Sequence, residues 1–267
     1  MSAATGTPGD SAPVRSNQPG VHPRLAEVVR RHLERAWEQP PHGPTVAALE
    51  ALRRRLPELH ERPLVLDSGC GTGESTLALA ARHPEALVLG IDRSAARLRR
   101  GGRVEPRCDG RAIWLRAELT TAWRWLADRG VHLRAHYLLY PNPWPKAAQL
   151  QRRWHGHPIF PTLLALGGRV ELRTNWRIYA EEFAIAAAIA GRRAAPAVAR
   201  LAEGPPLTAF ERKYAASGHA LYRVALAEAN AAPESARDGA GRDADVGESE
   251  RGDASPKNVV QEEVSSE

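Results

Sequence analysis

Cysteine is scarce in this sequence, since Cys70 and Cys108 are the two found in 267 residues. Two cysteines do not form a disulfide framework, and their surroundings lack the spacing of a zinc site. The chain also has no run of 18 uncharged apolar residues, and residues 1–20 lack the apolar core of a signal peptide. We therefore expect a cytoplasmic protein without a structural disulfide, a bound metal or a membrane span.

Acidic residues are unevenly distributed along the chain. The net charge is +6, but residues 231–267 contain ten acidic and four basic residues and so carry −6. The preceding 230 residues therefore carry +12. Such an excess of positive charge favours a polyanionic partner such as nucleic acid, although arginine also simply solvates many protein surfaces.

Aromatic residues are almost absent from both ends of the chain. Residues 1–20 and 231–267 are rich in Gly, Ser, Pro, Ala and charged residues, a composition typical of disordered segments. We predict a disordered N-terminal tail over residues 1–22, one folded domain over 23–230 and an acidic disordered tail over 231–267.

Strand and helix patterns alternate within the predicted domain. Short apolar runs predict strands over residues 64–69, 86–92, 112–118, 136–142 and 167–175. Helical patterns lie between or after them, over residues 75–83 (with Ser75 as the expected N-cap), 94–102, 121–130, 157–166 and 176–190. This alternation predicts an α/β fold, a mostly parallel Rossmann-like sheet with helices on both faces.

A glycine-rich turn, DSGCGTG, follows the first predicted strand. Gly69 and Gly71 let a ligand approach the backbone closely, and the G-x-G-x-G spacing differs from the dinucleotide-binding pattern. Asp92 ends the second strand, where a carboxylate can bind both hydroxyls of a ribose. Asp67 can receive an ammonium group. The arrangement suits S-adenosylmethionine, which has a ribose and an ammonium but no pyrophosphate.

Glu118 ends the third predicted strand and has two interpretations. It can hold the adenine amino group of the cofactor, or it can be an acidic residue favoured at the start of a helix.

The stretch YPNPWPK, residues 140–146, leaves the fourth predicted strand. Three prolines exclude both a helix interior and a central strand. Asn142 has a donor and an acceptor with which it can read a purine edge, and Trp144 can stack on a base. The alternative is a proline-rich loop with a packed tryptophan.

Basic residues follow this loop. Lys146, Arg152 and Arg153, with His155 and His157, can bind phosphates beside a base pocket, or they can form a solvated helix face. Near the C-terminus, Thr208 and Glu211 have the spacing of a helix capping box.

Together these motifs resemble the bacterial tRNA (guanine-N7) methyltransferase family. The family carries an acid-x-G-x-G turn, then G-I-E/D, P-D-P-W-x-K with a basic run, T-D-x-x-x-Y-A-E and T-x-F-E-x-R. In the same order, this chain has DSGCGTG, GID, PNPWPK with RRW, TNWRIYAE and TAFERK. The resemblance extends over about 150 residues, from Asp67 to roughly Leu226.

The resemblance implies S-adenosylmethionine as cofactor and tRNA as partner. It implies cofactor contacts at five residues: Asp67, Gly69, Gly71, Asp92 and Glu118. It implies contacts to RNA or guanine at Lys146, Thr208, Phe210 and Glu211. From the residues themselves we also expect Asn142 to be catalytic and the substrate to be contacted by Trp144, Arg152, Arg153 and Asn175.

Two positions depart from the family pattern, because Asn142 and Asn175 stand where the family has aspartates. Guanine N7 is a lone-pair acceptor, so its methylation needs no general base. We therefore predict that the protein still transfers a methyl group to guanine N7 in tRNA, but at a reduced rate. We expect it to be a monomer or a homodimer. The alternatives are a diverged methyltransferase acting on another nucleobase or a small molecule, and an RNA-binding protein without turnover.

Overall fold

A computed structural model describes residues 10–103, 107–192, 198–201 and 204–228. Contacts divide the chain after Asn230, and the second unit, Ala231–Glu267, lies outside the described residues, as does the predicted acidic tail. Among the described residues no helix is long and apolar enough to cross a membrane. No group of three metal-binding side chains was found in the same residues.

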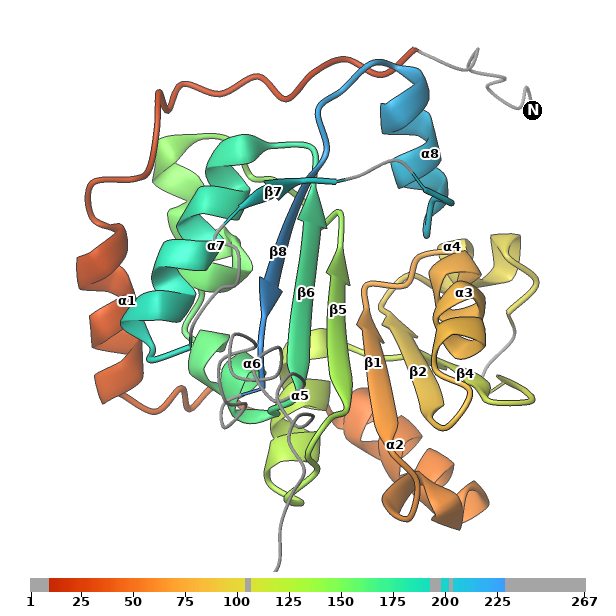
Figure 1. Ribbon diagram of the computed structural model, residues 1–267. Coiled ribbons are helices and arrows are strands. Elements are labelled where there is room, and N and C mark those ends of the chain that lie inside the picture. Colours follow the sequence, from red (N-terminus) through yellow and green to blue (C-terminus); the bar gives the residue numbers. More distant parts are fainter. Residues whose placement is uncertain (1–9, 104–106, 193–197, 202–203, 229–267) are drawn as a thin grey trace, which may run out of the picture. The chain divides into compact units, whose positions relative to one another are not determined.

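The described part of the chain contains one sheet of eight strands, in the order β3-β4-β2-β1-β5-β6-β8-β7 (Figure 1). The strands β4, β2, β1, β5 and β6 are parallel, and β8 and β3 are antiparallel to their neighbours. The strand bounds are β1 Leu64–Ser68, β2 Leu87–Asp92, β3 Arg107–Asp109, β4 Ala112–Arg116, β5 Ala135–Leu139, β6 Arg169–Thr174, β7 Ala199–Arg200 and β8 Tyr222–Leu226.

The helices and 3-10 turns alternate with these strands as the sequence predicts, from β1 to α7. Their bounds are α1 Leu25–Glu34, α2 Gly43–Arg55, η1 Pro57–His60, α3 Glu74–Arg82, α4 Ala95–Arg100, α5 Leu119–Ala127, η2 Ala147–Arg152, η3 Trp154–Gly156, α6 Phe160–Ala165, α7 Arg177–Ile189 and α8 Ala209–Ala216. All five predicted strands are present. The short strands β3 and β7 and the antiparallel β8 were not predicted.

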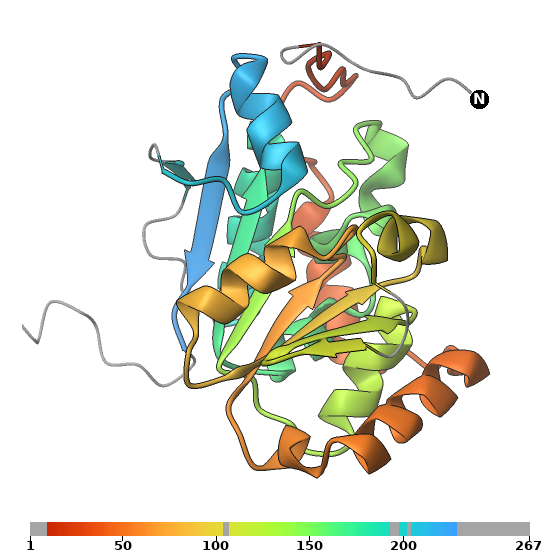
Figure 2. The same ribbon diagram turned by 90° about the vertical axis from the view of Figure 1, so that its right-hand side faces the viewer.

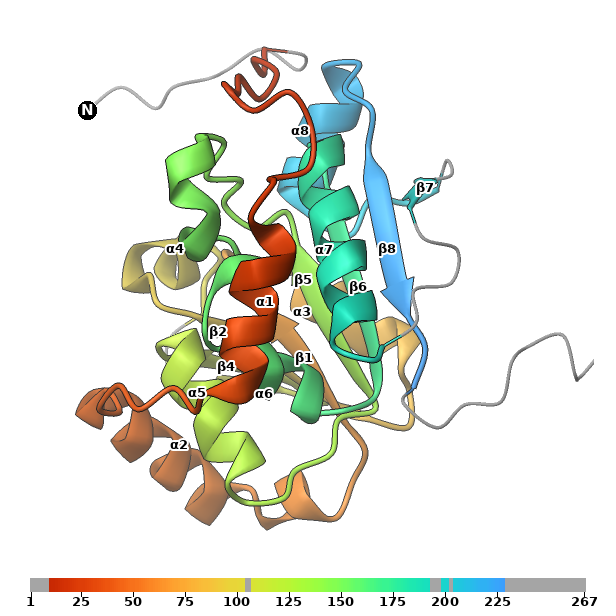
Figure 3. The ribbon, with the colours of Figure 1, turned by 90° about the vertical axis from the view of Figure 1, so that its left-hand side faces the viewer.

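Alternate residues of each central strand enter two different cores, as the two-residue period of a strand requires. Leu64 and Leu66 of β1 join the larger core, which α1, α5, α6 and α7 cover (Figure 3). Val65 joins the smaller core with Leu79 of α3 and Leu98 of α4 (Figure 2). Burial on both faces explains why these strands read as continuous apolar runs in the sequence.

The strand order places the carboxyl ends of β2, β1, β5 and β6 side by side at one edge of the sheet. The order reverses between β1 and β5, since the chain moves outward from β1 to β4 and then crosses back. Ligands of such sheets bind at the carboxyl ends next to this reversal. The loops that follow these four strands are therefore the place to look for a site.

Candidate active site

The glycine turn after β1 has the backbone that its sequence predicts. Gly69, Gly71 and Gly73 have φ values of 83°, 60° and 77°, which glycine adopts without strain. A Cβ added at Gly69 or Gly71 would meet nothing within 4 Å, whereas one at Gly73 would lie 2.2 Å from Nε1 of Trp114. The first two glycines thus leave open space for a ligand, and the third permits close packing.

Asp67 is buried at the end of β1. Its Oδ2 accepts hydrogen bonds from the Ser75 and Thr76 hydroxyls at 2.6 and 2.8 Å. The prediction that Ser75 is the N-cap of this helix is wrong, because α3 begins at Glu74 and Gly73 is its N-cap. The other oxygen, Oδ1, is buried without a partner. Burial raises the pKa of Asp67 to about 6, against the lowering effect of the two hydroxyls.

Asp92 ends β2 and ties two turns together. One of its oxygens accepts from the backbone N–H of Gly71 at 3.0 Å, and the other from Ser94 at 2.7 Å. Arg97 lies 3.7 Å from the same carboxylate. Asp92, the residue predicted to bind the ribose, is therefore hydrogen-bonded directly to the glycine turn.

Glu118 serves as the N-cap of α5. It accepts hydrogen bonds from the backbone N–H groups of Thr120 and Thr121 and from the Thr120 hydroxyl. Burial favours a higher pKa, but these hydrogen bonds outweigh it and lower the pKa of Glu118. Of the two interpretations of this residue, the structure contains the helix cap.

The loop after β5 is stiff and strained. Tyr140 and Trp144 both have positive φ, at 53° and 46°, a region that side chains other than glycine seldom adopt. Asn142 lies between them, exposed, and its side chain has no hydrogen bond to another described residue. Three prolines and two strained residues therefore present one free amide to solvent at the carboxyl end of β5.

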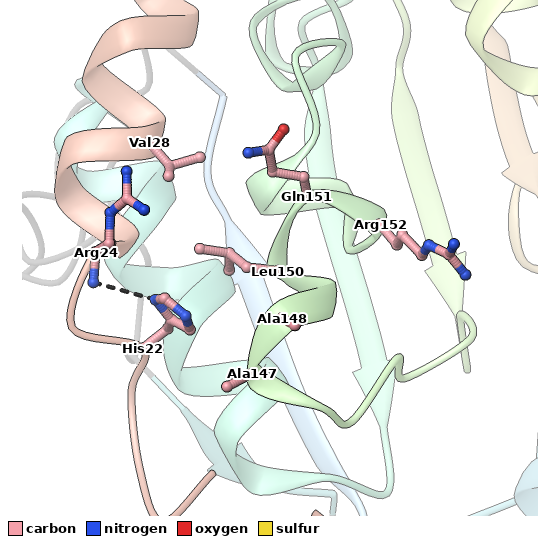
Figure 4. A pocket seen from close by; sticks show the side chains of 8 residues that line it. All are labelled: His22, Arg24, Val28, Ala147, Ala148, Leu150, Gln151 and Arg152. Carbon is pink, nitrogen blue, oxygen red and sulfur yellow. Dashed lines mark hydrogen bonds between the residues drawn. The ribbon is translucent and has the colours of Figure 1, made fainter. Parts of the chain in front are cut away.

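Arg152 is exposed and belongs to the same surface. Its guanidinium lies 4.8 Å from the centre of the Trp144 ring, and the exposed Lys146 precedes η2. Beside η2 is a pocket of about 360 Å³, with Val28 and Leu150 among its lining residues. Figure 4 shows the Arg152 side chain extending from η2 away from α1. Arg152 is thus exposed, as both the phosphate contact and the solvated helix face predicted from the sequence require.

Arg153 corrects our prediction, because it is 0% exposed and cannot reach RNA. Its Nε donates to the carbonyl of Trp144 at 3.1 Å and its Nη2 to that of Lys146 at 3.2 Å. The guanidinium thus holds the backbone of the proline-rich loop from beneath. His155 is also fully buried, so the phosphate contact proposed for it is wrong as well.

Glu182 of α7 is the partner of both residues. Its Oε2 accepts from Arg153 at 2.5 Å and pairs with His155 Nε2 at 2.9 Å. Burial would raise the pKa of Glu182, but the hydrogen bonds and charges of these two neighbours lower it to about 2. The carboxylate is therefore ionised in the core.

The N-terminal segment completes this network. Gln18 is 5% exposed, donates to Glu182 Oε1 at 2.5 Å and accepts from Arg153 Nη2 at 3.0 Å. Ser16 donates to the carbonyl of Pro145, and Asn17 accepts from the N–H of Ala147. We expected disorder through residue 22, but residues 10–22 form specific contacts; residues 1–9 lie outside the described residues.

Asn175, at the end of β6, is oriented by His219. The His219 Nε2 lies 2.8 Å from the carbonyl of Ser11, which can only accept, so Nε2 carries the proton. Its Nδ1 therefore accepts from the amide nitrogen of Asn175 at 3.2 Å. The Oδ1 of Asn175 is left as an acceptor for a ligand.

The residues of α8 have mainly structural contacts. Thr208 is the N-cap and accepts from the N–H of Glu211 at 2.9 Å. Glu211 is 3% exposed and pairs with Arg173 of β6 at 2.9 Å, although its Oε2 is buried without a partner. Phe210 is 51% exposed and stacks on Tyr214. Phe210 is therefore the most exposed of the three, Thr208 is partly exposed, and Glu211 is buried.

Four residues that shape the site were not identified from the sequence: Gln18, Arg173, Glu182 and His219. Each acts through a partner distant in the chain; Gln18 and Glu182, for example, are 164 residues apart. Glu182 directly follows the motif YAE. Nothing in the local sequence shows that Glu182, rather than the adjacent Glu181, is the buried one.

We predict that Glu182→Gln lowers the free energy of unfolding at pH 7 by about 3–5 kcal/mol, since it leaves the Arg153 charge unpaired in the core. Glu181→Gln is the matched control. Its ion pair with Arg177 is at the surface, so a change of about 0–1 kcal/mol is expected. Urea unfolding of both variants measures the difference.

The pH dependence gives a second readout of the same pair. The pKa of Glu182 in the folded chain is about 2, below its usual value of 4.5. Its contribution is therefore complete above pH 4.5 and is lost as the pH falls towards 2. The difference in the free energy of unfolding between the native chain and Glu182→Gln should therefore decrease over that pH range. A constant difference would contradict an ionised, paired Glu182.

A family model described as "Putative methyltransferase" matches residues 61–224 of this chain. A "tRNA (guanine-N(7)-)-methyltransferase" of Chromohalobacter salexigens is 30% identical over 248 residues, covering 82% of this chain and 96% of that protein. The enzyme of the same description from Leifsonia xyli is 30% identical over 60% of this chain and 74% of its own length.

Among solved structures, the 16S rRNA methyltransferase KamB is similar with a TM-score of 0.47 and 18% identity, over 66% of this chain and 93% of that one. At that level of likeness nothing about function follows. The family model and the relatives of similar length do decide the matter: this chain is a divergent member of the tRNA (guanine-N7) methyltransferase family.

Proposed function

We propose that this protein transfers a methyl group from S-adenosylmethionine to N7 of a guanine in tRNA. The observation that carries the proposal is the loop 140–146, which presents Asn142 at the carboxyl end of β5, the strand next to β1, from which the glycine turn leaves. The Arg153 side chain holds this loop by two of its carbonyls. The named activity of the relatives supports the same reaction.

The residues around the glycine turn fit the proposed cofactor. Gly69 and Gly71 leave open space next to the backbone, and Asp92 stands against that turn. The buried Oδ1 of Asp67 has no partner among the described residues, and a carboxylate oxygen in that condition attracts a cation such as an ammonium. When bound, S-adenosylmethionine supplies an electrophilic methyl group. Glu118 is occupied as a helix cap and contributes less.

The remaining chemistry is a matter of positioning. N7 of guanine carries a lone pair and no proton, so no residue has to act as a base. Holding N7 in line with the methyl donor accounts for much of the possible rate increase. Asn142 orients the base through its amide, and Trp144 offers a ring on which a base stacks. The free Oδ1 of Asn175 accepts from a donor on the same substrate.

The purine gains positive charge as the methyl group arrives. An aspartate at position 142 would stabilise that charge, whereas Asn142 offers only the partial charge of an amide oxygen. The reaction therefore proceeds more slowly here than with the aspartate of the family pattern. An RNA-binding role without turnover is the second candidate, favoured by the two asparagines at positions 142 and 175.

Lys146 and Arg152 provide cations for the phosphate backbone beside the base. Both are exposed and neither has a carboxylate partner among the described residues. N7 faces the deep groove of A-form RNA, which side chains do not enter. The target guanine is therefore presented in a loop or at a distorted junction.

The test of this proposal is the transfer of labelled methyl from S-adenosylmethionine to unmodified total tRNA, followed by nucleoside analysis. We expect 7-methylguanosine from the native chain and a rate at least about tenfold higher from Asn142→Asp, because that variant restores the formal charge. Asn142→Ala, which removes the amide, is the control and should be slower than both.

The outcomes separate the candidates. Product from Asn142→Asp alone would identify the native chain as an RNA binder or an enzyme for another acceptor. Absence of product from every variant, with cofactor bound, would exclude tRNA guanine N7 as the acceptor.

The pKa of Asp67 predicts a pH dependence of cofactor affinity. With a pKa of about 6, the carboxyl is protonated below that pH and must lose its proton to bind an ammonium. Affinity for S-adenosylmethionine, measured by calorimetry, should therefore fall as the pH decreases from 7 to 5. Thr76→Val removes a hydrogen bond that lowers this pKa, so its midpoint should move to higher pH. A flat profile in the native chain would contradict the role of Asp67.

A further inference from the structure

An arginine-rich surface surrounds α4, and neither the proposed reaction nor the family motifs account for it. Arg93, Arg99, Arg100 and Arg116 are all exposed. Arg93 and Arg116 follow or end the neighbouring strands β2 and β4, and Nε of Arg116 donates to the carbonyl of Arg93. We call these four residues the α4 arginine surface.

These charges are not neutralised by the part of the chain that the structure describes. None of the four arginines has a carboxylate within 4 Å among the described residues, while their neighbour Arg97 approaches Asp92. Two acidic residues at the starts of α3 and α5 are engaged elsewhere, since Glu74 pairs with Arg212 and Glu118 caps α5. The surface therefore attracts an external anion.

The α4 arginine surface lies directly beside the glycine turn. A Cβ added to Gly101, which follows α4, would lie 1.9 Å from the carbonyl oxygen of Thr72. The guanidinium of Arg103 lies 4.2 Å from the centre of the Trp114 ring, whose Nε1 donates to the carbonyl of Gly73. Hence α4 and its flanking residues are fixed against the turn that holds the proposed cofactor.

The surface has the chemistry of a phosphate-binding face. The one large apolar side chain of α4, Leu98, is buried, so no exposed anchor for a protein partner or a lipid phase is present on this helix. Guanidinium groups present a planar fork that matches phosphate geometry. A repeating phosphate backbone can contact several of these arginines at once.

We propose that the α4 arginine surface binds the phosphate backbone of the RNA substrate. In the sheet, β1 lies between β2, which precedes α4, and β5, which precedes Lys146 and Arg152. The RNA therefore contacts cations on both sides of the glycine turn, with the target base between them. This inference rests on the proposed function, since it assigns a second contact to the same substrate.

The test compares two double variants of the full chain. Arg99→Ala with Arg100→Ala removes two exposed charges next to the site without touching Asp92 or the glycine turn. Arg54→Ala with Arg55→Ala removes two exposed charges where α2 ends, before the chain enters the amino end of β1; neither has a carboxylate partner in the described ranges. The measurements are tRNA affinity from 50 to 300 mM salt, KM for tRNA and affinity for S-adenosylmethionine.

We expect the α4 variant to bind tRNA roughly tenfold more weakly and to lose about 1.5 from the slope of log affinity against log salt. The α2 variant should match the native chain, and cofactor affinity should be equal in all three. Equal tRNA affinity and KM in the two double variants would overturn the proposal.

The two proposals fail in different ways. If the native chain methylates tRNA and the α4 variant behaves like the control, the surface is wrong and the reaction stands. If the native chain binds tRNA through α4 but makes no 7-methylguanosine, the surface stands and the reaction is wrong. A native chain that does not bind tRNA overturns both.

Discussion

The ionised pair of Arg153 and Glu182 is the interaction on which the site depends. Both side chains are 0% exposed, and removing two such charges from water costs several kcal/mol per ion. The cost is offset because every part of the pair is hydrogen-bonded: Glu182 to four donors, Arg153 to a glutamine and two loop carbonyls. As a result, the proline-rich loop is held in place together with its two strained residues, Tyr140 and Trp144.

Much of the fold follows from the sequence because strands buried on both faces leave a clear record in it. The five apolar runs from residue 64 to 175 all form strands, and their order at the sheet edge brings Asp67, Asp92 and the proline-rich loop together. The missed strand β8 has no such record. This strand lies antiparallel to β6, and only two of its five residues are buried. Its sequence therefore lacks the continuous apolar run of a strand that is buried on both faces.

The errors in the site have a common physical origin. A run of basic residues does not reveal which member turns inward; Arg152 and Arg153 are adjacent, yet one is exposed and the other completely buried. Burial of Arg153 depends on the carboxylate of Glu182 in α7 and on the side-chain amide of Gln18, both of which are distant from it in the sequence. The same holds for Glu211, whose capping-box position says nothing of its ion pair with Arg173 in β6.

The long separation between Gln18 and Glu182 has a consequence for the order in which the protein is completed. A ribosome releases residue 18 early, but its partners Arg153, between η2 and η3, and Glu182 of α7 are made only after more than a hundred further residues. Closing such a contact comes late in folding, because the loop entropy must be overcome first. A nascent or truncated chain that stops before α7 lacks Glu182, the carboxylate partner of Arg153, and also the strands β7 and β8 that complete the sheet. The residues of the glycine turn are thus synthesised more than a hundred positions before the carboxylate that fixes the proline-rich loop, so an incomplete chain lacks the part that positions the substrate.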